Sequence, residues 1–472
     1  MKKKLFSNHR LIPVLAVALL LLSVSGASAG HTGIDGITGT TFNLAAKADH
    51  ITTADGGNYL IWGYADQGNN DGFAGQRAQY PGPTLIVKQG QTITVTLTNH
   101  LPEPTVSIIF PGQEGVTAIG GTAGLLTQES TGPGVTVTYS FVASKPGTYM
   151  YHSGSNMAKQ LEMGLMGALI VRPSLGDEYA YNHEDTRWDR EYLILLSEMD
   201  YRAHDAVEFN KPFNDTDYFS VYWFINGRVA PDNMAEAFVP WLPTQPYNNL
   251  PRMHPGEKLL MRVINAGRDL HPFHHHGNHA RIIARDGRML SSDGLSPDLA
   301  ESVFTIKAVP GQTVDAIFEW TGEKLGWDIY GTPADGRPDH DCIDGNGDGY
   351  ADPDNPANNP YEFCEDHGEP CIDNNDDGRD DTTGERCKNG WTKAFPTILP
   401  EKQDLAFGGW YGGSPFLGGV GDLPPGEGGL NPNGGFSYMW HSHTEKELTN
   451  FDIFPGGMLT MLIIEAWNVD IP

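Results

Sequence analysis

Two pairs of histidines in this chain have a spacing that would let them bind one transition metal. His274 and His276 form the first pair, and His441 and His443 form the second. Residues two apart on a β-strand point to the same side, so both imidazoles of a pair can converge on one ion. Imidazole is a ligand that suits copper and zinc. The sequence therefore predicts a metal centre carried by two strands.

The residue between the second pair of histidines limits the chemistry of that centre. Ser442 stands at the position where a copper electron-transfer site would have a cysteine. A serine hydroxyl is hard and neutral, which makes it a poor donor to Cu(I), so a blue thiolate–copper bond cannot form there. We therefore expect a metal site without the usual thiolate redox centre.

The strands that carry these histidines belong to a repeated unit. Residues 90–99 alternate between apolar and polar side chains, as a half-buried strand does, with Ile93, Val95 and Leu97 on one face. Residues 90–99 are matched by 256–265, residues 133–141 by 310–318, and residues 149–153 by 438–442. Because these matches keep their order and spacing, they predict two homologous β-domains, over residues 30–175 and 176–472.

A long insertion interrupts the second repeat. Phe141 and Tyr149 are near neighbours in the first repeat, whereas their counterparts Phe318 and Tyr438 are far apart. We therefore predict an insertion over residues 321–436, just before the last strands. It is acidic and poor in branched apolar residues, so it cannot form a hydrophobic core and needs cross-links to hold its structure. Two disulfides are the expected cross-links, formed by the four cysteines of the chain: Cys342, Cys364, Cys371 and Cys387.

Two acidic loops lie between these cysteines, within residues 341–388. Each follows a D-x-N-x-D-G pattern, in which oxygen ligands alternate along the chain and a glycine makes the turn that a hard cation requires. The alternative is a solvated, disordered acidic linker. We favour calcium because the pattern occurs twice, with these candidate ligands: Asp344, Asn346, Asp348 and Asp352 in the first loop, and Asp373, Asn375, Asp377 and Asp381 in the second.

The N-terminal residues predict export. Residues 1–29 combine a basic start, a short apolar stretch and a small-residue cleavage site, which is typical of a secretory signal peptide rather than a membrane span. The formal net charge of −28 is unsuited to nucleic acid or anionic membranes and attracts cations. We therefore expect a protein of the periplasm or the cell exterior, with no nucleic-acid partner and no membrane span after cleavage.

Taken together, four sequence motifs resemble the multicopper oxidase family. They are Pro81-Gly-Pro-Thr84, Gly147-Thr-Tyr-Met-Tyr-His-Ser153, His271-Pro-Phe-His-His-His-Gly277 and Gly456-Gly-Met458. The resemblance covers nearly all of the mature chain outside the insertion. It implies an all-β fold of two Greek-key cupredoxin β-sandwich domains and a copper-dependent oxidoreductase. Members of the family hold a trinuclear copper cluster with four His-x-His motifs, and a type 1 copper collects electrons from the substrate.

The resemblance assigns five of the eight histidines that hold the trinuclear cluster. The third and fourth motifs keep both histidines, the second keeps one, and the first, at residues 107–112, keeps none. The cluster ligands implied in this way are His152, His274, His276, His441 and His443. They suit one mononuclear copper or zinc ion per chain. The alternative is that these histidines are retained as hydrogen-bonded packing groups.

The type 1 copper position is degenerate by the same comparison. His271 and Met458 match family ligands, Ser442 replaces the cysteine, and Glu447 stands where a second histidine would be. These residues could still hold Cu²⁺ or Zn²⁺ weakly, but the soft anionic ligand is missing. A vestigial polar cluster is the alternative.

Three functions follow from these residues. The chain could carry out redox chemistry at a mononuclear copper, bind and sequester copper without turnover, or serve as a calcium-stabilised pseudo-oxidase scaffold of the cell envelope. Laccase-type four-electron oxygen reduction is excluded, because it needs the relay thiolate and three coppers. Two-domain relatives build their sites between subunits, so we also expect a homotrimer with an inter-subunit metal site. No sequence feature identifies the substrate.

Overall fold

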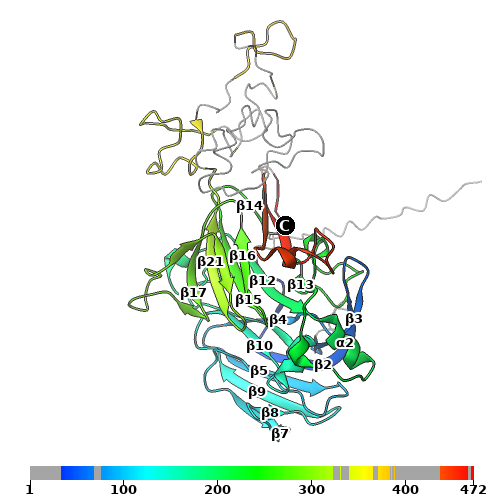
Figure 1. Cartoon of the computed structure of the whole chain (residues 1–472). Helices are drawn as coiled ribbons and strands as arrows, with labels where there is room; N and C mark the ends of the chain where they lie inside the picture. The colour runs from blue at the N-terminus through cyan, green and yellow to red at the C-terminus, as the bar shows by residue number, and fades with distance from the viewer. Residues whose placement is uncertain are drawn as a thin grey trace, which may run out of the picture.

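The computed structural model describes residues 33–68, 76–322, 330, 340–364, 370–382, 384, 387, 436–465 and 469–471. It is an all-β protein of two cupredoxin β-sandwich domains, as the sequence predicts (Figure 1). In Figure 1 the first domain is blue to cyan, and the second is green with red C-terminal strands.

The first domain consists of two main sheets. One has the strand order β3 (Asn58–Asp66), β2 (Thr41–Thr52), β5 (Thr92–Asn99), β9 (Thr136–Val142) and β6 (Thr117–Gly120). The other has the order β1 (Ile37–Thr38), β4 (Gly82–Lys88), β11 (Met166–Arg172) and β10 (Gly147–His152). A small hairpin, β7 (Thr122–Ala123) with β8 (Gln128–Glu129), and the helix α1 (Met157–Glu162) complete it.

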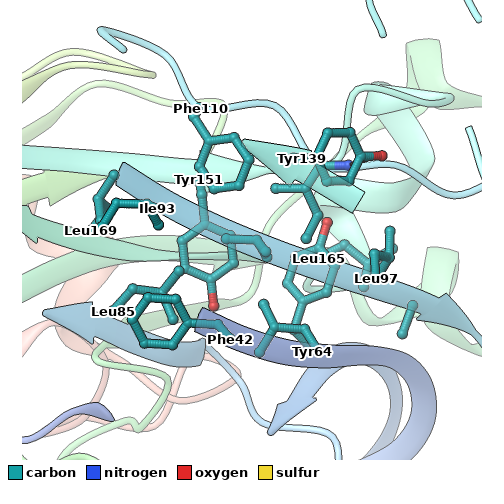
Figure 2. Packing of buried hydrophobic residues seen from close by; sticks show 14 of the residues in the cluster. Phe42, Tyr64, Leu85, Ile93, Leu97, Phe110, Tyr139, Tyr151, Leu165 and Leu169 are labelled. Atoms are coloured by element: carbon teal, nitrogen blue, oxygen red, sulfur yellow. Dashed lines mark hydrogen bonds between the residues drawn. The ribbon is translucent and has the colours of Figure 1, made fainter. Parts of the chain in front are cut away.

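Alternation along the strands builds the core of this domain. Ile93, Val95 and Leu97 of β5 are all fully buried, as predicted, whereas the threonines between them are partly exposed. They belong to one apolar cluster with Tyr64 of β3 and with Tyr151 of β10, a strand of the other sheet (Figure 2). The phenol of Tyr151 donates to the carbonyl of Pro83 at 2.6 Å, which satisfies its polar group inside the core.

The second domain also consists of two sheets. One has the order β13 (Tyr222–Ile225), β12 (Arg190–Met199), β15 (Lys258–Asn265), β21 (Thr313–Glu319), β17 (Ala280–Arg285) and β18 (Arg288–Met289), and β19 (Glu301–Val303) pairs with β17. The other has the order β14 (Arg252–Met253), β23 (Leu459–Ile464), β22 (Phe436–Ser442), β16 (His271–His275) and β20 (Thr305–Ala308). Short helices lie between strands: η1 (Glu184–Thr186), α2 (Tyr201–Glu208), η2 (Asp215–Asp217), η3 (Asp232–Met234) and η6 (Glu445–Leu448).

The two domains repeat one pairing scheme. In the first, β2 is parallel to β5 and β5 is antiparallel to β9; in the second, β12, β15 and β21 pair in the same way. Likewise β10–β11–β4 corresponds to β22–β23–β14, with an antiparallel pair followed by a parallel one. The matched sequence segments thus occupy equivalent strands of the two sandwiches.

The domains meet through an apolar layer and a buried charge network. Strands β3, β4, β10 and β11 contribute side chains such as Met150 and Ile170, which pack with Leu195 and Phe224 of the second domain. Beside this layer, the Arg262 Nε donates to the Glu191 carboxylate at 2.8 Å, and both side chains are fully buried. Such an interface fixes the two domains against each other.

The described part of the insertion lies at the end of the molecule beyond the second domain (Figure 1, yellow). Cys342 is bonded to Cys364 and Cys371 to Cys387, which confirms that all four cysteines form disulfides. Tyr330 donates to the carbonyl of Pro360 at 2.7 Å. The segment that contains the first acidic loop therefore contacts Tyr330, which comes before it in the chain.

Two sequence predictions lie partly or wholly outside the described residues. The signal peptide over 1–29 is one, and much of the 321–436 insertion is the other. Within the described ranges, none of the helices has the length and apolar character needed to cross a membrane.

Candidate metal centre

Strand register brings four histidines to one face of the β16–β22 pair. His274 lies directly opposite His441 in the antiparallel ladder, so their side chains share a face. The amide of His276 donates to the carbonyl of Met439 and that of His443 to the carbonyl of Pro272, which continues the pairing at both ends. His276 and His443 are each two residues from the central pair, and thus emerge on the same side.

The imidazole rings of these four histidines lie close together. Their centroids are 4.8 Å apart for His274 and His276, 5.5 Å for His274 and His441, and 5.0 Å for His274 and His443. One ligand nitrogen each from His274, His276 and His441 lies within 4.8 Å of the other two, the only such His, Cys, Asp or Glu group in the described part of the chain. The predicted convergence of both pairs is present.

Hydrogen bonds to neighbouring groups orient two of the rings. The Nδ1 of His441 is 2.7 Å from the carbonyl oxygen of Ser442. A carbonyl only accepts, so Nδ1 carries the proton and the Nε2 lone pair points the other way, as metal-binding histidines require. The Nδ1 of His274 is 2.9 Å from the hydroxyl of Thr305 on β20, which can hold that ring in the same fashion.

Burial and mutual repulsion keep His274 and His441 of the cluster neutral. Desolvation, followed by the charges that His276, His441 and His443 would carry, lowers the pKa of His274 to about 4. Desolvation also lowers the pKa of His441. Neutral imidazoles are the form that binds metal. The cluster is therefore ready to accept a cation at neutral pH without releasing protons from these two rings.

The donor geometry fits one tetrahedral ion. The Nε2 atoms of His276 and His441 are 3.2 Å apart. Two nitrogens bound at about 2.0–2.1 Å to one tetrahedral metal would be roughly 3.3 Å apart, so little movement is needed. His443, whose side chain is 55% exposed, lies next to this trio at the solvent edge. The arrangement offers three converging imidazoles, with a fourth imidazole beside them.

His152, the fifth predicted ligand, is placed elsewhere. It ends β10 in the first domain, and its Nδ1 is 2.9 Å from the carbonyl of Ser153, so its Nε2 has the orientation of a ligand. Desolvation lowers the pKa of this ring as well. However, within the described residues no ring contact joins His152 to the four histidines of the second domain. Among the described residues, His152 is therefore not part of the ring cluster that the four histidines of the second domain form.

His275 points away from the cluster. Its neighbour in register is Trp440, and its ring packs against Trp440 and Phe318 at centroid distances of 6.1 and 5.9 Å. Burial lowers the pKa of His275 to about 3, so it stays neutral in the core. Strand alternation accounts for this separation of His275 from the ligand face.

The degenerate type 1 position contains an ion triad. The Nδ1 of His271 is 2.9 Å from the carboxylate of Glu447, and its Nε2 is 2.8 Å from the carboxylate of Glu198. Burial would lower the pKa of His271, but the hydrogen bonds and charges of both carboxylates outweigh it and raise that pKa to about 9. Met458, the other predicted ligand, is fully buried among apolar side chains of the domain core. The position therefore holds a charged imidazolium between two carboxylates.

Sequence reasoning missed two residues of these sites. Glu198 near the end of β12 is a buried charge that follows the apolar residues 193–196, and its position in the strand could have indicated it. No feature of the sequence indicates the role of Thr305, because threonine is common in strands. Only the pairing of β16 with β20 places its hydroxyl beside His274.

The two acidic loops form tight turns. In the first, the Asp344 carboxylate accepts from the amide of Gly349 at 2.8 Å, and the Asp352 carboxylate accepts from Gly345 at 2.9 Å. In the second, the Asp373 carboxylate accepts from the amide of Gly378 at 2.9 Å. The loops therefore share one backbone form, and calcium binding there stays a prediction.

Comparison with known proteins finds similarity to multicopper oxidases. Residues 63–175 match the family model of multicopper oxidases. The chain is 36% identical over 167 residues to an L-ascorbate oxidase of Nicotiana tabacum, a match that covers 35% of this chain and 27% of that protein. It is 27% identical over 264 residues to the iron transport multicopper oxidase FET3 of Kluyveromyces lactis, which covers 55% of this chain and 35% of that protein.

A solved structure extends the likeness of the fold. The multicopper oxidase mgLAC superposes with a TM-score of 0.51 at 17% identity, covering 92% of this chain and 87% of that one. The chain spans only about a quarter of the length of the ascorbate oxidase that it matches, at 27%. The sequence match over residues 63–175 and the shared fold make this chain similar to multicopper oxidases.

Proposed function

We propose that this chain is an exported copper protein that binds one copper ion at His274, His276 and His441 and acts as an oxidoreductase. The observation that carries the proposal is the convergence of these three imidazoles, whose ligand nitrogens lie within 4.8 Å of one another. Imidazole suits both copper and zinc, and the similarity to multicopper oxidases favours copper. Export is supported by the signal-like residues 1–29 and by the two disulfides.

The surrounding residues would prepare the site for the metal. The Ser442 carbonyl and the Thr305 hydroxyl orient His441 and His274, and burial keeps both rings neutral. His443 lies at the exposed edge, where it can take or vacate a fourth position. A copper ion held there would supply one-electron redox chemistry. No thiolate adjoins the cluster, which argues against laccase-type oxygen reduction.

A non-catalytic role is the second candidate, and Ser442 favours it. With serine at this position, no thiolate links the cluster to an electron donor. A protein that sequesters or delivers copper needs only the affinity of the imidazoles. The calcium-stabilised scaffold is the third candidate, and it rests on the two acidic loops, in which aspartate and asparagine oxygens alternate.

We also propose that a homotrimer completes the site. His152 has the ligand orientation but lies outside the cluster of its own chain. A neighbouring copy could bring its first domain to the β16–β22 face and add His152 as a further ligand. Light scattering tests this proposal, because a monodisperse monomer that retains copper would contradict it.

Equilibrium dialysis against Cu²⁺ followed by elemental analysis tests copper binding. We expect about one copper per chain in the wild type. The His441→Ala variant should retain far less, because the ring is central to the cluster. His100→Ala is the matched control, since His100 is an exposed histidine of the first domain and its loss should leave the copper content unchanged.

Turnover distinguishes the two leading candidates. If copper-loaded protein oxidises or reduces small donors in a His441-dependent manner, the oxidoreductase is supported. Full copper loading without any such turnover would support sequestration. Failure of the wild type to retain copper above the level of His441→Ala would overturn both.

A further inference from the structure

We infer that the Glu198–His271–Glu447 triad has replaced the type 1 metal, and that this position is a metal-free ion triad. The family resemblance assigns His271, Glu447 and Met458 to that metal, together with a cysteine that is Ser442 in this chain. The residues do not fit a metal, for three independent reasons.

The first reason is that neither nitrogen of His271 is available. Glu447 lies 2.9 Å from Nδ1 and Glu198 lies 2.8 Å from Nε2. A metal needs a nitrogen lone pair, whereas an imidazole that donates to two carboxylates carries a proton on each nitrogen. The His271 and Glu198 side chains are fully buried, so water does not compete for these bonds. A metal could enter only by displacing one buried carboxylate and stranding its charge.

The second reason is that the backbone is built around the carboxylates. The Glu198 carboxylate also accepts from the amides of Arg268 and Asp269, the latter at 3.2 Å. A Cβ on Gly267 would lie 1.8 Å from Glu198 Oε2, so only glycine lets the loop come this close. Glu447 belongs to η6, and a Cβ on Gly457 would lie 2.0 Å from its carbonyl oxygen. Both acids are thus held in place by their loops.

The third reason is the state of the remaining ligands. The Ser442 hydroxyl accepts from the amide of Thr444 at 3.2 Å, and serine offers no soft anion. Met458 is fully buried in the apolar core of the second domain. The triad carries two negative charges and one positive charge, and it provides no site for electron entry. Together with the proposed function, this means that electrons must reach the histidine cluster without an intervening metal.

Copper retention in a chain that lacks the cluster tests the inference. In a His274→Ala/His441→Ala background, dialysis against Cu²⁺ should leave no bound copper, because the triad cannot hold any. One retained copper per chain that is lost on further Glu447→Gln substitution would overturn the inference. The result is separate from the proposed function, which predicts copper only in chains with an intact cluster.

Restoring the thiolate gives a second readout. The copper-loaded Ser442→Cys variant should show no intense visible thiolate–copper absorption, because His271 is still bound by two carboxylates. Such absorption in the single variant would overturn the inference. Nitrogen-15 spectra of histidine-labelled wild type require no substitution. They should show both His271 ring nitrogens protonated and unchanged by Zn²⁺, and a Zn²⁺-induced shift of one nitrogen would contradict the triad.

Discussion

At the scale of single residues, His271 and His274 lie three residues apart on strand β16, and at neutral pH the first is charged and the second is neutral. His271 lies between two carboxylates, which raise its pKa to about 9 against the effect of burial. His274 lies among other imidazoles, and desolvation together with their repulsion lowers its pKa to about 4. Histidine is therefore protonated at position 271, whereas at position 274 it is neutral and has a lone pair available for a metal.

The raised pKa of His271 predicts a loss of stability at alkaline pH. Its contribution is fully present below the unfolded value of about 6.5 and is lost as pH rises through about 9. The shift corresponds to at most about 3 kcal/mol. Asp269, an exposed carboxylate nearby, contributes to the same field. Urea unfolding of the metal-free wild type should therefore show stability falling between pH 6.5 and 9.

Glu447→Gln is the matched control for that titration. It keeps the shape of the side chain and removes one charge, so the pKa of His271 should fall, and the alkaline loss of stability should become smaller and be complete at lower pH. An unchanged pH profile in this variant would contradict the assigned charge of His271.

The lowered pKa of His274 predicts acid sensitivity of the metal-free chain. A histidine held neutral contributes stability above its unfolded value of about 6.5, and this is lost as pH falls toward about 4. The His274→Gln variant should lose less stability than the wild type between pH 6.5 and 4, measured by thermal unfolding. An equal loss in both proteins would show that other groups dominate acid unfolding.

At the scale of elements, the site depends on the register of three strands. Strand β22 places His441 opposite His274, and β20 places Thr305 beside it. A slip of one residue would turn both histidines into the core and bring His275 out. The buried Trp440 and Phe273, which pack edge-to-face at 6.4 Å, oppose that slip from the core side.

Thr305→Val tests the contribution of β20. Valine keeps the size and branching of threonine but removes the hydroxyl 2.9 Å from His274 Nδ1. Loss of this orienting bond should weaken copper affinity about 10- to 100-fold while unfolding is little changed. Thr305→Ser, which keeps a hydroxyl, should restore most of the affinity, as competition with a copper chelator can measure. Equal affinity in all three proteins would contradict the orienting role.

At this scale the sequence predicted most of the site. Alternation and repeat spacing are local properties, so they indicated the strands that carry His274 and His441 and the burial of Ile93, Val95 and Leu97. Thr305 and Glu198 could not be predicted in the same way. Their roles depend on which strands become neighbours, and short segments do not encode that pairing.

At the scale of the whole molecule, buried charges connect the domains. Glu191 receives hydrogen bonds from Arg172 of the first domain and Arg262 of the second, the latter at 2.8 Å. Thr148 of the first domain donates to Asp315 of the second at 2.5 Å. The network holds β10 against β15 and β21, and β10 carries His152 at its end.

Arg262→Ala should be strongly destabilising. It would leave the Glu191 and Asp315 carboxylates buried with fewer partners, which costs about 3–5 kcal/mol. The exposed pair of Lys88 and Asp177 offers the contrast, because Asp177→Ala should change stability by less than about 1 kcal/mol. Guanidinium unfolding measures both variants, and similar losses would contradict the importance of the interdomain network.

The relation between the domains was the hardest feature to predict. The five histidines share one sequence pattern, yet His152 lies apart from the four of the second domain. Residue spacing cannot show whether one chain or a neighbouring copy unites them, because that depends on packing between domains. The disulfides of the insertion were easier to predict than the relation between the domains. Four clustered cysteines in a chain with a signal-like N-terminus favour disulfide formation.

The most direct test of the central claim is the EPR and visible spectrum of the copper-loaded wild-type protein, recorded with its copper content. We predict about one EPR-active copper per chain, without intense thiolate absorption, and its loss in His441→Ala. A blue spectrum, or copper that persists unchanged in His441→Ala, would contradict the mononuclear histidine site.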